Sequence, residues 1–521
     1  MVKSVKLNGI EGVCVDVECT ISEGIGIHLV GIVDAAVKEI LLRTVTALQA
    51  NGYTIPGKKI VFTLNPVETY KSGSAYDLAI ALALIRASGQ DSYDTGDHSG
   101  NLDNMLETIG EWLVVGELGL DGSVRAVNGC VQAVEVAIAS GCKGVIIPED
   151  NASEIVGAFE KDVIPVYGVR NLAEAIGSIA GNGTYASTVW EKESKEPDIA
   201  PVTFDQIAGH ELGKRALEIA AAGGHSLLMI GAPGSGKATL ARALVDILPR
   251  LTQEEKIVVA EAFSAAGRTG DYASGRRPFR APHVSASKPA LLGGGRGENI
   301  IPGEVTLANR GVLFIDEFAE APKSTFEALR IPVEDHNVTI ARLHSKVSMP
   351  ASFILVGASN PCPCGYFGEG DRCTCTAGLR AAYLSRLDNP LTDHFDLHLW
   401  THPVDDARIL DGNKGDSAEV VAERVAKARA VQMKRFANDG IKTNAEMTPK
   451  LVSRYCTLSD ECSEMVSQLI DRLGLHPRAY GHILKVARTI ADLAGYEDIQ
   501  RNHLIEAAGF RFLDRRNHKA E

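Results

Sequence analysis

A glycine-rich stretch that follows an apolar run has the residue types that bind the phosphates of a nucleotide. Residues 231–238 read GAPGSGKA, close to the template GxxxxGK followed by Ser or Thr. In such a loop the glycines let backbone N–H groups point at the phosphates, the following helix adds the positive end of its dipole, and the lysine adds a point charge. The alternative is a glycine-rich turn without a ligand. The candidate nucleotide-binding residues are Gly231, Ala232, Pro233, Gly234, Ser235, Gly236, Lys237, Ala238 and Thr239.

The last position of this motif departs from the template. Ala238 stands where a Ser or Thr hydroxyl would coordinate Mg²⁺. Thr239 comes one residue later, about 100° further around a helix, so we do not expect it to substitute. Water can fill the vacant coordination position, because Mg²⁺ readily keeps several waters. We therefore expect ATP binding to persist and hydrolysis to be slowed.

Acidic and amide side chains follow two further apolar runs. Residues 312–317 read VLFIDE, and Asp316 at the end of this run is placed to hold the hydration shell of Mg²⁺. Glu317 is the candidate to polarise the attacking water, and Asn360, which ends the next apolar run, could orient that water. A phosphate loop, an acidic strand end and a polar strand end, in this order, predict an ATPase core and disfavour the ligand-free turn.

Four cysteines lie within fourteen residues. Cys362, Cys364, Cys373 and Cys375 form two CxC pairs joined by the glycine-rich turn GYFGEGDR. Four thiolates at this spacing can close a tetrahedral structural zinc site. The alternative is a set of reduced cysteines that pack within a loop, and the sequence leaves both interpretations open.

A basic segment stands out in a chain whose net charge is −13. Residues 268–296 hold six Lys or Arg residues against a single acid, Asp271, and a hairpin near residues 338–349 adds two more cations. Such residues could contact the phosphates of a DNA backbone. The alternative is a surface of salt bridges between subunits. The candidate DNA-binding residues are Arg276, Arg277, Arg280, Lys288, Arg342 and Lys346.

Length and composition limit the class of protein. The 521 residues correspond to three to four domains at roughly 150 residues each. A chain with 45% hydrophobic and 23% charged residues is globular, and its net charge excludes a generally basic nucleic-acid coat. Neither a membrane-spanning run of about 18 apolar residues nor the apolar core of a signal peptide is present. We expect a cytoplasmic protein with reduced thiols and no membrane partner.

Hydrophobic periodicity predicts an α/β protein with a helical C-terminal part. Apolar runs at 59–64 and 144–148 predict strands, and the patterns at 77–85 and 131–139 predict helices. The polar, proline-containing stretch 182–201 is typical of a linker. The predicted organisation is an α/β domain over 1–181, the linker over 182–201, a second α/β domain over 202–402 and a helical domain over 403–521.

Several longer segments resemble the magnesium-chelatase-like AAA+ ATPases of the ComM (YifB) type. In the second half these are RPFRAPH with SAS (276–287), GEVTLANRGVLFIDE (303–317), LVGASNPCPCG (355–365) and HPRAYGHILKVARTIADLAG (476–495). In the first half they are HLVGIVDAAVKE (28–39), KSGSAYDLAIALAL (71–84) and VVGELGLDGSVRAVNG (114–129). The resemblance covers nearly the whole chain.

The resemblance implies a Lon-protease-like N-terminal domain, an AAA+ core with a parallel sheet and a helical lid. It also implies a ring of identical subunits, usually a hexamer, that binds ATP and Mg²⁺ and acts on DNA as a helicase-like motor for branch migration in the recombination of incoming DNA. Two alternatives are a nucleotide-binding scaffold with weak hydrolysis and a chelatase-type motor subunit for metal insertion into a tetrapyrrole. A protease is disfavoured, because Ala75 and Ala133 occupy the positions of the nucleophile and the dyad lysine.

The resemblance also assigns roles to three residues around the nucleotide. Arg478 matches the lid arginine that contacts the γ-phosphate. His394 stands where the family has an arginine finger, a residue that stabilises transition-state charge on the neighbouring subunit's nucleotide. Arg386, eight residues upstream, is a candidate replacement.

Overall fold

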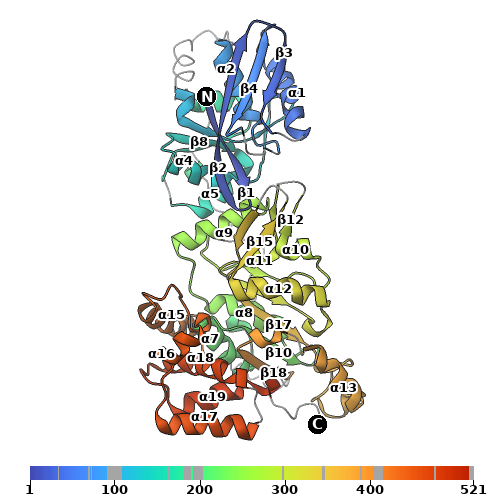
Figure 1. Ribbon diagram of the computed structural model, residues 1–521, viewed down its shortest axis with the longest axis vertical. Helices are drawn as coiled ribbons and strands as arrows, with labels where there is room; N and C mark the ends of the chain where they lie inside the picture. The colour runs from blue at the N-terminus through green and yellow to red at the C-terminus, as the bar shows by residue number, and fades with distance from the viewer. Residues whose placement is uncertain are drawn as a thin grey trace.

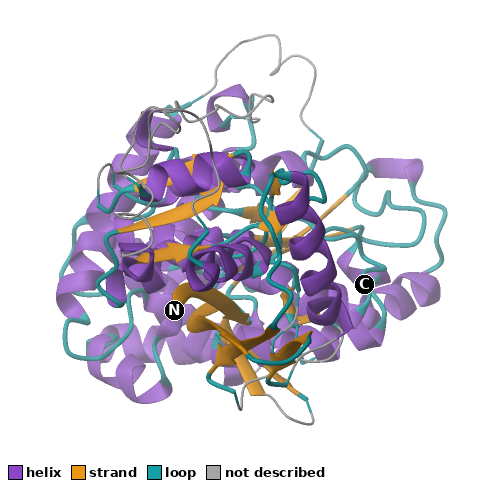
Figure 2. Cartoon of the chain, turned by 90° about the horizontal axis from the view of Figure 1, so that it is seen from above, coloured by secondary structure: helices purple, strands orange, loops and turns teal. Residues whose placement is uncertain are grey.

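The chain forms an elongated molecule, with an N-terminal α/β unit at one end, a second α/β unit in the middle and a group of helices at the other end (Figure 1). In the view from above, helices surround the central strands (Figure 2). The structure is a computed structural model that describes residues 1–32, 35–67, 71, 73–90, 108–160, 163–180, 189–191, 203–270, 272–295, 299–342, 346–387, 390–403, 415–473 and 477–514.

The N-terminal unit is built on a seven-stranded sheet with the order β3-β4-β2-β1-β5-β8-β9. Along β5 and β8 the side chains alternate between the two faces, as the period of two in a strand requires. Val114 and Ile146 face one helical layer, and Leu113 and Val145 face the other. The strands are β1 (Val2–Asn8), β2 (Glu11–Ser22), β3 (Gly26–Val30), β4 (Lys59–Asn65), β5 (Trp112–Val114), β8 (Gly144–Pro148) and β9 (Val166–Val169).

Helices cover both faces of this sheet. The first layer holds α1 (Ala35–Ala50), α2 (Asp77–Ser88) and α6 (Leu172–Ile179), and the second holds α4 (Cys130–Ala139) and α5 (Ala152–Ala158). A small hairpin of β6 (Glu117–Leu118) and β7 (Val124–Arg125) lies beside them. The predicted strands at 59–64 and 144–148 and the predicted helices at 77–85 and 131–139 are all found.

The second unit is built on a five-stranded parallel sheet with the order β11-β14-β17-β10-β18. The three inner strands are buried along their whole length, as a parallel sheet with covered faces requires. Because the strands are parallel, all their carboxyl ends lie at one edge. The strands are β10 (Leu227–Gly231), β11 (Phe279–Arg280), β14 (Val312–Ile315), β17 (Ile354–Ser359) and β18 (Leu397–Thr401).

The connections of this unit carry its remaining elements. Two short antiparallel pairs, β12 (Gly293–Gly294) with β13 (Ile301–Pro302) and β15 (Asn337–Ala341) with β16 (Lys346–Pro350), lie on the side of the N-terminal unit (Figure 1). The helices are α7 (Glu211–Gly223), α8 (Lys237–Ile247), α9 (Gln253–Ala265), α10 (Lys288–Leu292), α11 (Glu304–Leu307), α12 (Lys323–Asp335) and α13 (Ala377–Leu384).

A shared core joins the two units. Helix α9 packs against α4 and α5, and Val347 and Met349 of β16 enter the same cluster. Gln132 donates one hydrogen bond to the carbonyl of Ile10 and one to the carbonyl of Glu261, each of 2.8 Å. Gly9 in the β1–β2 turn leaves no room for a Cβ beside Val347. The inner face of the β15–β16 hairpin is therefore sealed by the N-terminal unit.

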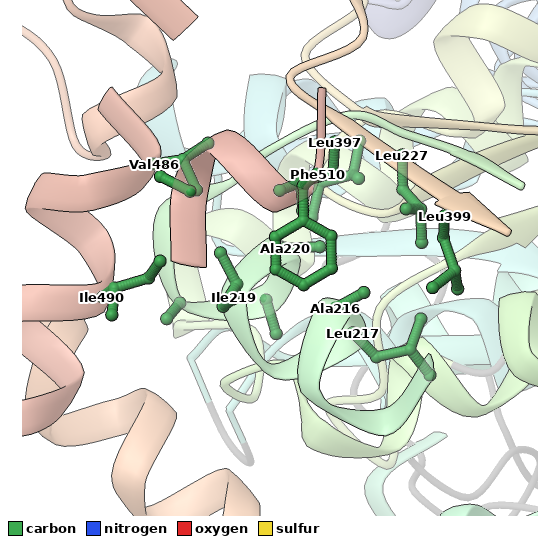
Figure 3. Packing of buried hydrophobic residues seen from close by; sticks show 14 of the residues in the cluster. Ala216, Leu217, Ile219, Ala220, Leu227, Leu397, Leu399, Val486, Ile490 and Phe510 are labelled. Carbon is green, nitrogen blue, oxygen red and sulfur yellow. The ribbon is translucent and has the colours of Figure 1, made fainter. Parts of the chain in front are cut away.

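The described elements after β18 are all helical: α15 (Ala418–Arg435), α16 (Pro449–Tyr455), α17 (Asp460–Leu473), α18 (Pro477–Ala494) and α19 (Arg501–Gly509). Figure 3 shows α7 between strands β10 and β18 on one side and α18 on the other, with Leu217, Leu399 and Ile490 among the buried side chains. In the described ranges, no helix combines the length and the apolar character that crossing a membrane requires.

A buried carboxylate of α18 joins this helix to α15 and to the short 3-10 helix Asn444–Glu446. The two oxygens of Asp492 accept hydrogen bonds from Arg435 at 2.6 and 2.8 Å, from Asn444 at 2.9 Å and from Arg488 at 3.1 Å. Arg488 is almost fully buried. Removing one member of such a group leaves an uncompensated charge in the interior.

We therefore expect Asp492→Ala to destabilise the helical part by about 3–5 kcal/mol, because two arginines would lose their carboxylate. The matched control is Glu423→Ala, which removes an exposed pair with Lys427 on α15 and should leave the stability almost unchanged. Chemical denaturation followed by circular dichroism measures both. Equal stability of the two variants would contradict the role of Asp492.

Candidate nucleotide-binding site

The parallel sheet brings three predicted segments to one edge. The glycine-rich loop follows β10, which pairs with β17 on one side and β18 on the other, and β17 pairs in turn with β14. Asn360 follows β17 and Asp316 follows β14. Neighbouring strands therefore deliver the loop, the amide and the carboxylate in sequence across the sheet edge, which is where open α/β sheets bind ligands.

The loop has the backbone conformation that such a turn needs. Gly234 and Gly236 have φ values of 78° and 73°, in the left-handed region that favours glycine. Pro233 and Gly234 are exposed, whereas Ser235 is buried and its hydroxyl lies 2.8 Å from the hydroxyl of Thr401. The loop is thus anchored to the end of β18 through Ser235, while Pro233 and Gly234 are open to solvent.

The side chain of Lys237 is held inside the glycine-rich loop by two backbone carbonyls. Its Nζ donates hydrogen bonds to the carbonyls of Gly231 and Ala232 at 2.7 and 2.9 Å. Burial lowers the pKa of Lys237, and the negative charge of Asp316 opposes that shift. A phosphate group brought to the loop would offer this half-buried ammonium a stronger, charged acceptor than the two carbonyls.

Asp316 and Glu317 are exposed at the end of the buried strand β14. The Asp316 carboxylate accepts a 2.9 Å hydrogen bond from the backbone N–H of Glu317. Glu317 has a φ of 50°, which is uncommon for a residue with a side chain and is stabilised by its surroundings. Phe318 provides that support, because it is buried against Phe326 and Phe395 with ring centroids 5.0 and 5.2 Å away.

Ala238 and Thr239, in the first turn of α8, are both exposed. The vacant Mg²⁺ ligand position expected at Ala238 stays a prediction. Asn360 is half-buried and lies close to Gly365, whose added Cβ would be 3.9 Å from the Asn360 side chain.

The structure gives fewer contacts for Arg478, His394 and Arg386, the three residues whose roles the resemblance implies. Arg478 belongs to the first turn of α18, and its side chain lies outside the described residues. His394 is 3.3 Å from Glu334. Arg386 contacts Glu320 of its own chain at 2.6 Å and lies over the Tyr383 ring.

The candidate DNA-binding residues divide into two groups. Arg276, Arg277 and Arg280 form ion pairs of 2.6–2.8 Å with Asp246, Glu255 and Glu304, and their side chains are only 21%, 15% and 25% exposed. In this conformation these three arginines are paired with carboxylates of their own chain. Lys288, Arg342 and Lys346 are exposed. Asp271 and Arg296 lie outside the described residues.

The four clustered cysteines come together in space. The sulfurs of Cys362, Cys364, Cys373 and Cys375 all lie within 4.8 Å of one another. The cluster is beside the nucleotide-binding loop, because Gly365 sits directly over Pro233.

Two residues at this site were not predicted from the sequence. Thr401 ends β18 and anchors Ser235, and the ring of His210 lies against Gly236 at the start of α8. Thr401 carries a signal that could have been used, since it ends an apolar run and polar residues at the ends of parallel strands meet at one edge. His210 lies in a loop before α7 and has no comparable signal.

Comparison with known proteins agrees with this arrangement. The family described as magnesium chelatase, subunit ChlI, matches residues 203–409, its C-terminal family matches 415–511, and a further ChlI subunit family matches 17–151. The uncharacterized protein YifB of Salmonella typhimurium is 37% identical over 514 residues, which cover 97% of this chain and 96% of the relative. The competence protein ComM of Haemophilus influenzae is 36% identical over 514 residues, with the same coverage.

The chain belongs to the magnesium-chelatase-like AAA+ family of the ComM (YifB) type. A more distant likeness also exists within this AAA+ group: the DNA helicase MCM8 of Xenopus tropicalis is 26% identical over 211 residues, which cover 36% of this chain and 22% of the relative.

For this ComM-type chain, we expect Lys237→Ala to weaken ATP binding by about 100-fold or more, because the described loop loses its cation. Titration with a fluorescent ATP analogue measures the affinity. The control is Lys323→Ala, an exposed lysine at the start of α12, which should leave binding unchanged. Unaltered affinity in Lys237→Ala would refute the site.

Proposed function

We propose that this protein is an ATP-binding and ATP-hydrolysing AAA+ ring protein that acts on DNA as a helicase-like motor. The observation that carries the proposal is the convergence of the loop at Lys237, the carboxylate of Asp316 and the amide of Asn360 at one edge of a parallel sheet. These groups suit a magnesium nucleotide: backbone amides and an ammonium suit phosphates, and an exposed carboxylate suits Mg²⁺.

Each residue has a proposed role around the nucleotide. Lys237 and the loop amides bind the phosphates, Asp316 holds the hydrated Mg²⁺, and Glu317 accepts the proton of the attacking water. Asn360 orients that water, and Arg478 contacts the γ-phosphate. The metal, when bound, would neutralise charge that develops on the phosphate oxygens. The acidic strand end is already exposed, so the water that Glu317 activates can reach it from solvent.

The proposal for DNA has two supports. One relative is a competence protein and a more distant one is a DNA helicase. The second support is that Lys288, Arg342 and Lys346 remain exposed around the β12–β13 and β15–β16 pairs, and Arg342 reaches the carbonyl of Gly295 at 3.4 Å. In a ring, several copies of such a basic surface could follow a DNA backbone.

We further propose the domain organisation that the resemblance implies: a non-proteolytic Lon-like domain over 1–181, a linker over 182–201, the AAA+ core over 202–402 and a helical lid over 403–521, assembled as a homo-oligomer, in the hexameric form. Most of the linker lies outside the described residues. Its described part, 189–191, packs on the N-terminal unit, where Trp190 donates a 3.1 Å hydrogen bond to the carbonyl of Ile164.

Two altered positions favour a second candidate function, a nucleotide-binding scaffold that hydrolyses ATP slowly. Ala238 lacks the hydroxyl ligand for Mg²⁺, and His394 replaces the arginine finger. A lost ligand or hydrogen-bonding contact typically costs about 1–3 kcal/mol, roughly 5- to 150-fold in rate. Because the binding groups are intact, hydrolysis distinguishes the two candidates.

We expect slow hydrolysis that DNA stimulates, with Ala238→Thr raising the rate roughly 5- to 150-fold and the further change His394→Arg raising it again. Phosphate release with and without forked or single-stranded DNA measures this. Leu379→Ala, an exposed change on α13, serves as the control. If hydrolysis is undetectable with DNA and neither change restores it, the motor is excluded and the scaffold stands.

DNA binding is expected to depend on the exposed cations. Replacing Lys288, Arg342 and Lys346 together by Ala should weaken DNA binding and reduce the salt dependence of the affinity, because fewer counterions are released. A matched control replaces three exposed lysines of the C-terminal helical part, Lys427, Lys434 and Lys450. Fluorescence anisotropy with labelled DNA at several salt concentrations compares them. Equal losses in both triple variants would mean that only overall charge matters.

A further inference from the structure

Three sulfurs of the cysteine cluster have the spacing of a metal tetrahedron, and the fourth, that of Cys375, lies within 4.8 Å of each of them. Cys362 and Cys364 are 3.4 Å apart, Cys362 and Cys373 3.8 Å, and Cys364 and Cys373 3.7 Å. A zinc ion with Zn–S bonds of about 2.3 Å separates its sulfurs by about 3.8 Å. Disulfides require about 2.05 Å, so the sulfurs are not paired.

Backbone amides surround two of these sulfurs. The N–H groups of Gly365 and Phe367 hydrogen-bond to the sulfur of Cys362, and those of Tyr366 and Thr374 to the sulfur of Cys364. Metal-bound thiolates are oriented by outer hydrogen bonds of this kind. All the donors come from residues 365–374, so the turn between the two CxC pairs wraps around the sulfurs.

The turn contains little regular secondary structure, and contacts such as those of Phe367 with Arg380 and of Glu369 with His402 join it to neighbouring elements. Its only described regular element is the three-residue turn Gly370–Arg372, and three of its glycines, Gly365, Gly368 and Gly370, have positive φ. A segment of this kind has high conformational entropy when it is unrestrained. A metal held by both ends of the segment would supply the missing constraint.

Residues 362–375 contact the glycine-rich loop directly, and they also contact the residue that precedes its anchor, Thr401. A Cβ added at Gly365 would lie 2.8 Å from Cδ of Pro233. Phe367 packs edge-on against Trp400, with ring centroids 6.3 Å apart, and Trp400 precedes Thr401, the residue that anchors Ser235. The segment also begins two residues after Asn360. Its position therefore affects both the loop and the amide at the strand end.

We propose that Cys362, Cys364, Cys373 and Cys375 bind one structural zinc ion, and that this ion holds residues 362–375 against Pro233 so that loss of zinc weakens nucleotide binding. Four thiolates with no open position suit zinc in a structural role. The coupling to nucleotide rests on the proposed ATP site, whereas the metal assignment does not.

Metal content tests the assignment. Protein purified under reducing, non-chelating conditions should contain about one zinc per chain by mass spectrometry of the elements. Cys364→Ser combined with Cys373→Ser should lose it, and Cys14→Ser, a partly exposed cysteine of β2, should keep it. Absence of zinc from the unaltered protein, or iron in its place, overturns the assignment.

Nucleotide affinity tests the coupling without altering any cysteine. Removing the zinc from the unaltered protein with a chelator and reductant should raise the Kd of a fluorescent ATP analogue roughly tenfold, about 1.4 kcal/mol, and added zinc should restore it. Unchanged affinity after confirmed zinc loss overturns the coupling. If the zinc-loaded protein binds no nucleotide at all, the proposed ATP site fails and the coupling with it, while metal content still decides the assignment.

Two glycines within residues 362–375 provide a second variant and its matched control. Gly365→Ala keeps all four cysteines but places a Cβ against Pro233, so zinc should be retained while nucleotide affinity falls. Gly370→Ala has a similar positive φ of 60° and no neighbour within 4 Å, which makes it the matched control. Equal affinities of these two variants contradict the contact as the route of coupling.

Discussion

The parallel pairing of β14, β17, β10 and β18 is the constraint on which the rest of the structure depends. It places Asp316, Asn360, the glycine-rich loop and Thr401 at one edge, although they are separated by up to 170 residues of chain. No other arrangement of these strands would set Asn360 between the loop and the carboxylate. The burial of the strands stabilises this order, since α7 and α8 cover the sheet and α18 packs on α7. The chemistry at the edge therefore depends on hydrophobic packing away from it.

A second consequence concerns the charges of an acidic protein. The arginines of the basic segment neutralise carboxylates that come from other elements: Asp246 from the end of α8, Glu255 from α9 and Glu304 from α11. Helix α9 also packs on the N-terminal unit, where burial raises the pKa of Glu154 and Ser264 donates a 2.6 Å hydrogen bond to it. Of these pairs, Arg277 with Glu255 joins the basic segment to α9, the helix that packs on the N-terminal unit. The three pairs join neighbouring elements of the fold, whereas the other described candidate cations, Lys288, Arg342 and Lys346, are exposed.

This division explains what could be predicted from the sequence. The phosphate loop, the acid at Asp316 and the strands and helices of the α/β fold are local features, because a glycine spacing or a periodicity of two or 3.6 is contained in a short window. The partners of Arg276, Arg277 and Arg280 lie 22 to 30 residues away along the chain, so a count of charges in one segment cannot detect them. Thr401 and His210 join the site only through tertiary structure, and the closeness of the four sulfurs depends on how one turn folds.

Features of the backbone and the orientation of individual side chains also contribute differently to binding and to hydrolysis at the proposed nucleotide site. The proposed nucleotide binding uses backbone amides and Lys237, whose side chain donates hydrogen bonds to two loop carbonyls, in a loop that Ser235 anchors to Thr401. These are properties of the fold and survive a change of side chain at position 238. The proposed hydrolysis depends on the orientation of side chains, and the two departures that the resemblance implies, Ala238 and His394, are of this kind. Glu317 has a backbone conformation that is uncommon for a residue with a side chain, and the cysteine segment lies against Pro233 of the loop. Under the proposed function, ATP binding follows from the fold of the loop, while the rate of the chemical step is set by side chains that surround it.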